Sequence, residues 1–292
     1  MGNSRGFIRR YKFLHRPALY IWNIPSRVEE SYRHHKTDCY LISFPKCGRT
    51  WLRLIIGKYI EERFKLQSVP KADILELTPL SKYNSEIPLI QVTHDDRPDL
   101  KKPAEIEKNK KKYRKKKVLF LVRDPRDVVV SQYFQLLKRE RKIEEIGISE
   151  FIRLEKGSLN SIIRFYNVWY ENREIPKDFL IVKYEDLHTQ FYKEKRLDEL
   201  TRILKYIGFE HVDMALLSLI AKYAAFDNMK KLERRGEFES EYKRLNPIDE
   251  DDDESYKTRR GKIGGYHDYC DKKDIVYMDR LIEEDLNDYY QY

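Results

Sequence analysis

The stretch that decides the fold runs from Leu41 to Trp51 and reads Leu-Ile-Ser-Phe-Pro-Lys-Cys-Gly-Arg-Thr-Trp. It begins as an apolar, strand-like run, continues into a short loop, and leads directly into an apolar pattern of helical period. A strand, a tight loop and a helix in this order present backbone N–H groups and the positive end of a helix to an anion. The loop differs from that of the nucleotide triphosphatases, because its lysine precedes its only glycine. The stretch therefore predicts either a cradle for a phosphate-like group or an ordinary turn with a surface lysine.

A second segment repeats this organisation. The apolar run 118–122 is long enough for a buried strand and too short for a helix, and Arg123 follows it. The Asp-Pro pair that comes next is typical of a helix start. We therefore expect Arg123 at the carboxyl end of a strand, where open α/β sheets bind ligands, with Ser131 in the first two turns of the next helix. Arg123 could instead pair locally with a following aspartate, but two such segments in one chain favour a ligand with two separated anionic groups.

These two segments resemble the two cofactor signatures of the sulfotransferases that use 3′-phosphoadenosine-5′-phosphosulfate (PAPS), in particular the soluble cytosolic branch. Three further segments resemble that family's motifs and follow in its order: Val-Lys-Tyr-Glu-Asp-Leu at 182–187, Ala-Phe-Asp-Asn-Met at 225–229, and Arg-Arg-Gly-Lys-Ile-Gly-Gly at 259–265. The five segments span nearly the whole chain. The resemblance implies a three-layer fold related to the P-loop nucleotide triphosphatases, with a central parallel sheet flanked by helices.

The resemblance also implies a role for each matching residue. The groups expected to hold the 5′-phosphosulfate are Lys46 and the backbone of Cys47, Gly48, Arg49 and Thr50, with the Thr50 hydroxyl as a further contact. Those expected at the 3′-phosphate are Arg123, Ser131, Arg259, Arg260 and Gly261. Those expected around the adenine are Trp51, Tyr184, Phe226 and Met229. Without the neighbouring motifs, Trp51 and Phe226 could equally be core aromatics, and the arginine pair could be a solvated basic surface.

The candidate general base is His94, which follows a strand-like run and resembles the histidine of the family's Lys-Thr-His segment. An unperturbed histidine pKa of about 6.5 leaves the ring neutral and able to accept a proton near pH 7. One relative uses a glutamate on the first helix as base, and that position is Leu54 here, which again favours His94. The resemblance implies an in-line displacement in which His94 deprotonates the acceptor and Lys46 stabilises the departing phosphate oxygen. The chain departs from the family pattern at Cys47, Arg49, Val92 and Ala224, where the family usually has serine, threonine, lysine and threonine.

The rest of the chain predicts one α/β domain. At 292 residues with 41% hydrophobic side chains, the chain can bury a large core. Strand signals near 39–44, 89–93, 118–122 and 179–183 alternate with helical patterns, which predicts a parallel sheet with helices on both faces. The clearest helical patterns cover 160–172, 193–207, 212–232 and 272–290. We expect a single domain over residues 1–292, with a basic N-terminal extension at 1–36 and a charged, mobile loop at 233–258.

The net charge of +9 is concentrated in short runs. Residues 108–117 and 5–12 are basic, the latter with interspersed aromatics, whereas 249–254 is acidic. The favoured interpretation is that charged runs are solvated flanks. The basic runs could also steer an anionic donor or an acidic acceptor glycan, or contact nucleic acid or a membrane surface.

The location expected from the sequence is the cytoplasm, with peripheral membrane contact through the basic N-terminus as a further option. Neither an apolar run of membrane-spanning length nor a signal peptide is apparent. Three scattered cysteines do not make a disulfide framework, and no cysteine or histidine spacing typical of a metal site occurs. We therefore expect no metal.

The function expected is transfer of a sulfuryl group from PAPS to a hydroxyl or amine, with adenosine 3′,5′-bisphosphate (PAP) released. The acceptor could be a glycan, a glycolipid or a small metabolite, and the oligomeric state stays open. One alternative is a nucleotide kinase of related fold, which the missing Gly-Lys-Ser/Thr disfavours. Another is a non-catalytic nucleotide- or nucleic-acid-binding module, although no nucleic acid partner is expected.

Overall fold

The computed structural model describes residues 23–66, 69–140, 143, 146–188, 193–237, 248–249 and 251–292. The chain divides into two units, 1–36 and 37–292, and each is described by itself. In the first unit the described residues form one helix, α1 (Asn23–Lys36), whose last turn carries four basic or histidine side chains. Cations there interact favourably with the negative end of the helix dipole. The basic segment 5–12 lies outside the described residues.

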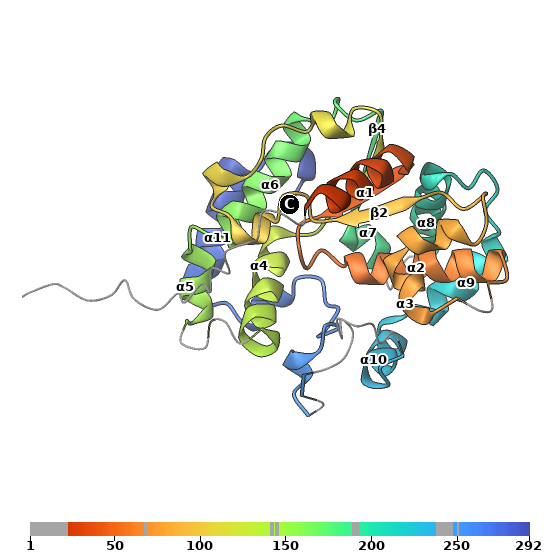
Figure 1. The fold of residues 1–292 in the computed structure, drawn as a ribbon. Helices are drawn as coiled ribbons and strands as arrows, with labels where there is room; N and C mark the ends of the chain where they lie inside the picture. The colour runs from red at the N-terminus through yellow and green to blue at the C-terminus, as the bar shows by residue number, and fades with distance from the viewer. Residues whose placement is uncertain are drawn as a thin grey trace, which may run out of the picture. The chain divides into compact units, whose positions relative to one another are not determined.

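The second unit is built on a four-stranded parallel sheet of order β2-β1-β3-β4 (Figure 1). The strands are β1 (Cys39–Ser43), β2 (Ile90–Thr93), β3 (Lys117–Val122) and β4 (Asp178–Lys183). In the register, Ile42 of β1 lies opposite Thr93 of β2 and Phe120 of β3. Every residue of β1 is buried, as expected for a parallel strand covered on both faces. All four predicted strands are confirmed, each to within one residue at either end.

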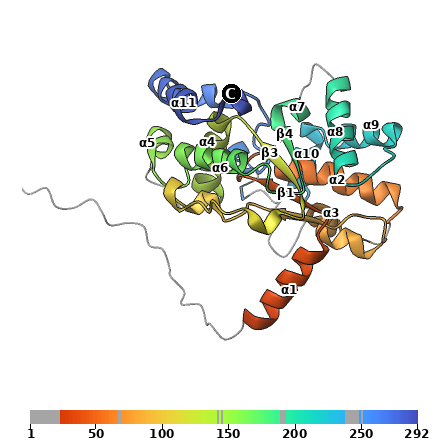
Figure 2. The same cartoon turned by 90° about the horizontal axis from the view of Figure 1, so that it is seen from above.

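Helices cover the sheet on both sides. Figure 2 shows the strands between one group of helices that contains α2, α8 and α9 and another that contains α4, α6 and α11. The helices of this unit are α2 (Arg49–Arg63), α3 (Lys71–Glu76), α4 (Pro125–Phe134), α5 (Ile148–Arg153), α6 (Leu159–Glu171), α7 (Tyr184–His188), α8 (Lys193–Ile207), α9 (Met214–Tyr223), α10 (Phe226–Arg234) and α11 (Lys272–Asp285). The predicted layered α/β architecture is confirmed. Among the described residues, no helix combines the length and the apolar character needed to span a bilayer.

Two helix predictions are wrong in their extent. The pattern over 212–232 forms two helices, because Ala225 adopts an extended conformation with φ −60° and ψ 149° and interrupts the helical hydrogen bonding. This break makes Phe226 the first residue of α10. The pattern over 272–290 ends as an α-helix at Asp285, and Leu286 is extended with ψ 134° before a short turn at Asp288–Tyr290.

The basic run 108–117 is not a wholly solvated flank, which corrects the sequence-based interpretation. Lys110 is fully buried, and its Nζ lies 2.7 Å from Oδ2 of Asp95. Tyr113 donates from its hydroxyl to Oδ1 of the same carboxylate at 2.8 Å, and the Lys112 ammonium lies 2.8 Å from that oxygen. The buried Asp95 carboxylate thus faces three donor groups, which offsets the cost of removing its charge from water. The run therefore anchors the turn that follows β2.

The acidic run 249–254 is tied to its surroundings where the structure describes it. Asp252 pairs with Lys138 at 2.9 Å, Asp253 with Lys230 at 2.7 Å, and Glu254 with Arg259 at 2.9 Å. Most of the preceding part of the predicted loop, residues 238–247, and residue 250 lie outside the described residues. Through the ion pair between Glu254 and Arg259, the acidic run thus helps to hold the segment that follows it in place.

Candidate functional site

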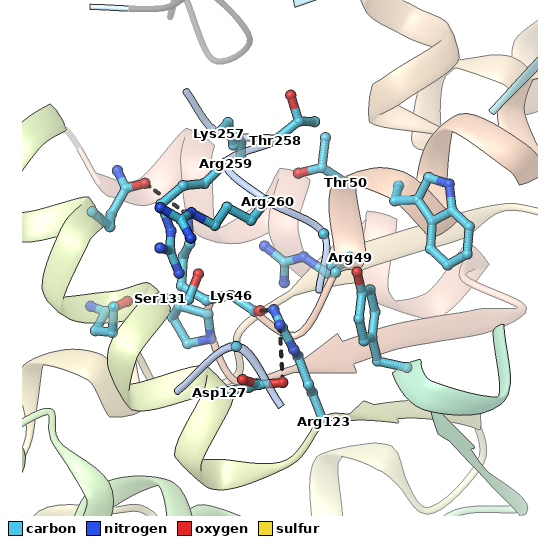
Figure 3. A pocket seen from close by; sticks show the side chains of 18 of the residues that line it. Lys46, Arg49, Thr50, Arg123, Asp127, Ser131, Lys257, Thr258, Arg259 and Arg260 are labelled. Atoms are coloured by element: carbon cyan, nitrogen blue, oxygen red, sulfur yellow. Dashed lines mark hydrogen bonds and ion pairs between the residues drawn. The ribbon is translucent and has the colours of Figure 1, made fainter. Parts of the chain in front are cut away.

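A cavity of about 500 Å³ lies at the carboxyl end of the sheet. Each of the four strands contributes a lining residue directly after it or within the loop that follows: Lys46 after β1, His94 after β2, Arg123 after β3 and Tyr184 after β4. Ligands of open α/β sheets bind at this edge. Figure 3 shows residues from α2, α4 and the segment 257–260 gathered around the space between the two loops.

The first loop forms a cradle whose shape depends on glycine. Gly48 has φ +84°, and a Cβ placed there would lie 2.4 Å from Cδ2 of Tyr184, so only glycine fits. Helix α2 begins directly after it, at Arg49, and no side chain caps its N-terminus. The uncapped N–H groups of a first turn are available to an anion. Lys46 lines the same space and donates from Nζ to Oε1 of Gln135 at 3.0 Å.

The second loop holds Arg123 against the first. Its Nη1 donates to the backbone carbonyl of Lys46 at 3.4 Å, and its Nη2 donates to the carbonyl of Lys262 at 3.0 Å. The predicted helix start is confirmed, since the side chain of Asp124 accepts from the N–H of Arg126 at 2.9 Å and α4 begins at Pro125.

Local pairing of Arg123, the alternative considered from the sequence, is also present. Arg123 Nη2 lies 3.3 Å from Oδ2 of Asp127, as Figure 3 shows, yet the Nε of the same guanidinium is buried with no hydrogen-bond partner among the described residues. A buried N–H without a partner is costly, so this atom indicates a place for an acceptor group. Ser131 lines the cavity from the second turn of α4.

Asp127, which the sequence motifs do not identify as functional, joins this loop to the segment after residue 256. Its carboxylate accepts from the backbone N–H of Gly264 at 2.9 Å and of Tyr266 at 3.1 Å. The same segment places Gly261 at φ +57°, where a Cβ would lie 2.3 Å from Cδ2 of Phe226. Arg123 and Gly261 are therefore brought to one cavity through a shared aspartate.

Arg259 and Arg260 of this segment line the cavity, and nearby carboxylates balance part of their charge. Arg259 lies 2.9 Å from Glu254 and donates to the hydroxyl of Tyr269 at 2.5 Å, and Arg260 lies 3.3 Å from Asp268. These contacts fix the direction of both guanidinium groups. Arg259 is thus not a freely solvated side chain, whereas Arg260 stays exposed.

Aromatic side chains line another part of the cavity. The ring of Trp51 lies 5.9 Å from that of Tyr184, and its Nε1 donates to the carbonyl of Ala224 at 2.6 Å. Phe226 and Met229, both in α10, also line the cavity. Trp51 and Phe226 are only partly buried, so neither is a fully buried core aromatic.

The contacts of His94 define which ring nitrogen carries its proton. Nδ1 lies 2.9 Å from the backbone carbonyl of Ser43, which can only accept, so Nδ1 is the protonated nitrogen. Nε2 lies 2.6 Å from Nη2 of Arg49, which can only donate, so Nε2 carries the lone pair. Burial, reinforced by the Arg49 charge, lowers the pKa of His94 well below its usual value. The ring is therefore neutral at pH 7.

The cavity carries a large positive excess. Its cationic lining side chains are Lys46, Arg49, Arg53, Arg97, Arg123, Arg196, Lys257, Arg259, Arg260 and Lys262, against the carboxylates of Asp99, Asp127 and Glu140. Burial and the repulsion of neighbouring cations lower the pKa of Lys46 to about 7 and that of Lys257 to about 7. Cations crowded in this way are stabilised when an anion with several charges binds among them.

The structure brings the predicted site residues together with one exception. The side chain of Cys47 points away from the cavity and is fully buried, with Sγ 3.3 Å from the hydroxyl of Tyr166. Burial raises its pKa to about 12, and only its backbone belongs to the cradle. Sequence reasoning missed Lys257, Gln135 and Arg196, which also line the cavity, because each lies outside the motifs. No group of three or more His, Cys, Asp or Glu side chains suited to a metal ion occurs within the described residues.

Comparison with known proteins places these observations in a family. The family model described as a sulfotransferase domain matches residues 36–290. The chain is 24% identical over 304 residues to the amine sulfotransferase of Oryctolagus cuniculus, covering 99% of this chain and 94% of that protein. It is 24% identical over 277 residues to the flavonol 3-sulfotransferase of Flaveria bidentis, covering 88% and 84%.

A solved structure shares the fold. The structure of mouse sulfotransferase SULT7A1 complexed with PAP superposes with a TM-score of 0.54 at 19% sequence identity, and covers 86% of this chain and 84% of that one. The likeness in three dimensions agrees with the family match over most of the sequence. The chain belongs to the sulfotransferase family.

Proposed function

We propose that this protein transfers a sulfuryl group from PAPS to a hydroxyl or amine of an acceptor, and that PAP is the second product. The observation that carries the proposal is the meeting of Lys46 and Arg123, which come from two separate strand–loop–helix segments, at one cationic cavity. A nucleotide with a 5′-phosphosulfate and a separate 3′-phosphate has two anionic ends of the kind that such a site accommodates.

The residues present fit this nucleotide. Lys46 and the N-terminus of α2 would hold the 5′ end, with Thr50 adding a hydroxyl. Arg123, Ser131, Arg259 and Arg260 would hold the 3′-phosphate, for which the unpartnered Nε of Arg123 offers a donor. Trp51, Tyr184, Phe226 and Met229 would receive the adenine, and the two crowded glycine positions, Gly48 and Gly261, keep its neighbourhood free of side chains.

The chain's own residues supply proton transfer and charge stabilisation. When bound, the nucleotide supplies the sulfuryl group. His94 accepts the proton of the acceptor at Nε2, while its Nδ1 stays bonded to Ser43 and keeps the ring oriented. Lys46 and the N–H groups that begin α2 stabilise negative charge where it develops on the 5′-phosphate oxygen. In this structure Arg49 donates a hydrogen bond to Nε2 of His94 and so occupies its lone pair. Arg49 must therefore move away from Nε2 before His94 can accept a proton there.

The remaining expectations stay predictions of this proposal. Lys46 and His94 suffice for the chemistry without a metal, and no nucleic acid partner is required. The three cysteines are free and buried, which supports the cytoplasmic location expected from their number. The names of the relatives, an amine and a flavonol sulfotransferase, support a low-molecular-weight acceptor.

The proposal is tested by thermal shift with PAP and with ATP, followed by an acceptor screen with radiolabelled PAPS. We expect PAP to raise the melting temperature more than ATP does at equal concentration, and label to reach at least one acceptor only in the presence of PAPS. Stabilisation by ATP but not PAP would favour the nucleotide-kinase alternative. Binding of nucleic acid that weakens steeply with salt, without any label transfer, would favour the non-catalytic alternative.

A further inference from the structure

The part of the cavity around His94 is lined by charge. The cations that act on this histidine are Arg49, which touches Nε2 at 2.6 Å, Arg97 and Lys257. Arg97 is balanced by Asp99, with its Nη2 at 3.0 Å from that carboxylate. The environment of the candidate base is therefore polar and cationic, on the side where an acceptor must approach.

Apolar lining is found elsewhere in the cavity. Apart from Pro45, the apolar and aromatic lining side chains among the described residues are Trp51, Tyr184, Ala225, Phe226, Met229 and Tyr269. Four of these are the residues proposed for the adenine, and the hydroxyl of Tyr269 is bonded to Arg259 and Glu254. Little apolar surface in the described lining is left to receive a flat apolar acceptor.

Lys257 is a cation of the cavity to which the proposed binding of PAPS assigns no role. Its backbone N–H is fixed by Oε1 of Glu233 at 2.6 Å, whereas its ammonium makes neither a hydrogen bond nor an ion pair within the part of the chain that the structure describes. The neighbouring charges that act on it most are the cations Arg53, Arg139 and Arg49, while Glu233 acts in the opposite direction. Lys46, Arg123, Arg259 and Arg260 already provide cations for the two ends of the nucleotide. An ammonium with this surplus charge is best satisfied by a further anion.

The cavity also offers an acceptor for hydroxyl groups. The side chain of Gln132 is 3% exposed and lines the cavity, and its Oε1 has no hydrogen-bond partner among the described residues. Gln135 lies on the same side and is bonded to Lys46. A ligand rich in hydroxyl groups can donate to Oε1 of Gln132, whereas an apolar ligand leaves this oxygen buried without a partner.

We propose that Lys257 and Arg49 form an anion subsite beside His94, and that the acceptor is an acidic saccharide whose carboxylate binds there while a neighbouring hydroxyl meets Nε2 of His94. The proposal rests on the proposed function, since it assigns the second substrate of the same cavity. It differs from the acceptor class that the name of the flavonol 3-sulfotransferase describes for that protein.

The test compares two probes on the enzyme saturated with PAP. 4-Nitrophenyl β-D-glucuronide and 4-nitrophenyl β-D-glucoside differ only in a carboxylate against a hydroxymethyl group, and calorimetry measures the binding of each. We expect the glucuronide to bind about ten- to a hundredfold more tightly, the range for a hydrogen bond to a charged group. Lys257→Met should abolish this preference by weakening glucuronide binding alone, and Lys257→Arg should retain it.

The matched control is Lys102→Met, which removes the same charge outside the cavity, where Lys102 pairs with Glu155 at 2.6 Å. This variant should keep the full preference. Equal binding of the two probes, binding of neither, or a preference that survives Lys257→Met would overturn the inference. PAP binding is measured first in each protein. If the wild type does not bind PAP, the result counts against the proposed function. If it binds PAP normally but does not prefer the glucuronide to the glucoside, the result counts against this inference alone.

Discussion

Nη1 of Arg123 lies 3.4 Å from the backbone carbonyl oxygen of Lys46 and donates a hydrogen bond to it. The two residues are 77 positions apart and follow neighbouring strands, β3 and β1. Because parallel neighbours end at the same edge of the sheet, each loop forms one wall of a single cavity. This contact is the structural basis for a ligand with two anionic ends.

Arg123→Met should weaken PAP binding by about ten- to a hundredfold, because a charge-assisted contact to the 3′-phosphate is lost. Binding of adenosine 5′-monophosphate, which lacks that phosphate, should change little. Calorimetry with both nucleotides checks the difference. Arg126→Met is the control, since Arg126 of α4 pairs with Asp124, the residue before that helix, and with Asp279 of α11, and does not line the cavity. An equal loss for both nucleotides would contradict the assignment of Arg123 to the 3′-phosphate.

Gly261→Ala should weaken PAP binding as well. Its φ of +57° strains any L side chain, and the new Cβ would meet the ring of Phe226 at 2.3 Å and displace it. Gly147→Ala is the control, because φ is −71° and nothing lies within 4 Å of the added carbon. We expect a small change in melting temperature and normal PAP affinity for the control. Normal PAP affinity in Gly261→Ala would show that Phe226 does not contact the nucleotide.

His94→Ala should lower turnover by about 10²- to 10⁴-fold, the range for loss of a general base. PAP binding should stay within a few-fold of the wild-type value, since the ring lies at the acceptor side. Single-turnover kinetics with radiolabelled PAPS and calorimetry with PAP separate the two effects. His211→Ala serves as the control, because His211 accepts a hydrogen bond from Arg63 through its backbone carbonyl, which the substitution keeps. Full activity of His94→Ala would assign the base to another group.

PAP binding should weaken as the pH rises above about 7. In the free protein, burial and cationic neighbours lower the pKa of Lys46 to about 7, and bound phosphate raises it again. Below pH 7 the ammonium is protonated in both states, so it adds no pH dependence. Above pH 7 it must take up a proton on binding, and the affinity falls by at most about tenfold per pH unit for this group.

Calorimetry in Tris and in HEPES, whose ionisation enthalpies differ, measures this proton uptake at pH 8. We expect net uptake by the wild type and less uptake by Lys46→Met. Proton release on binding would contradict the electrostatic account of the cavity.

Lys110→Met should lower the free energy of unfolding by about 3–5 kcal/mol, because it leaves the Asp95 carboxylate buried without its closest ammonium. Urea denaturation measures this change. Asp95 follows His94 directly and sits at φ +43°, so turnover should fall as the turn relaxes, even where the variant is fully folded. Lys111→Met is the control, since Lys111 is exposed. Equal stability of the two variants would show that the buried pair is not important for folding.

The strands and the cradle could be predicted from the sequence because their signals are local. Short apolar runs precede the loops that carry Lys46 and Arg123, and such runs indicate buried strands. The Asp-Pro pair marks the start of α4 directly. The break at Ala225 could not be predicted, since alanine is a good helix former and the interruption depends on tertiary packing.

Residues outside motifs were missed for a related reason. Lys257 reads as one more charge in a polar segment, and its proximity to Lys46 arises only when the segment folds over the cavity. Lys110 reads as part of a solvated run, yet it is buried because its ammonium pairs with Asp95, 15 residues earlier in the chain. Asp127 looks like a local partner of Arg123, although it also holds Gly264. These three assignments need distances between residues far apart in sequence.

The proposed function requires that one cavity binds both ends of the same nucleotide. Calorimetric titration of the wild-type protein with PAP, with adenosine 3′-monophosphate and with adenosine 5′-monophosphate measures this. We expect PAP to bind at least about a hundredfold more tightly than either monophosphate, because its two phosphates bind at once, and each monophosphate to compete with PAP. PAP affinity no higher than that of the better monophosphate would contradict the claim.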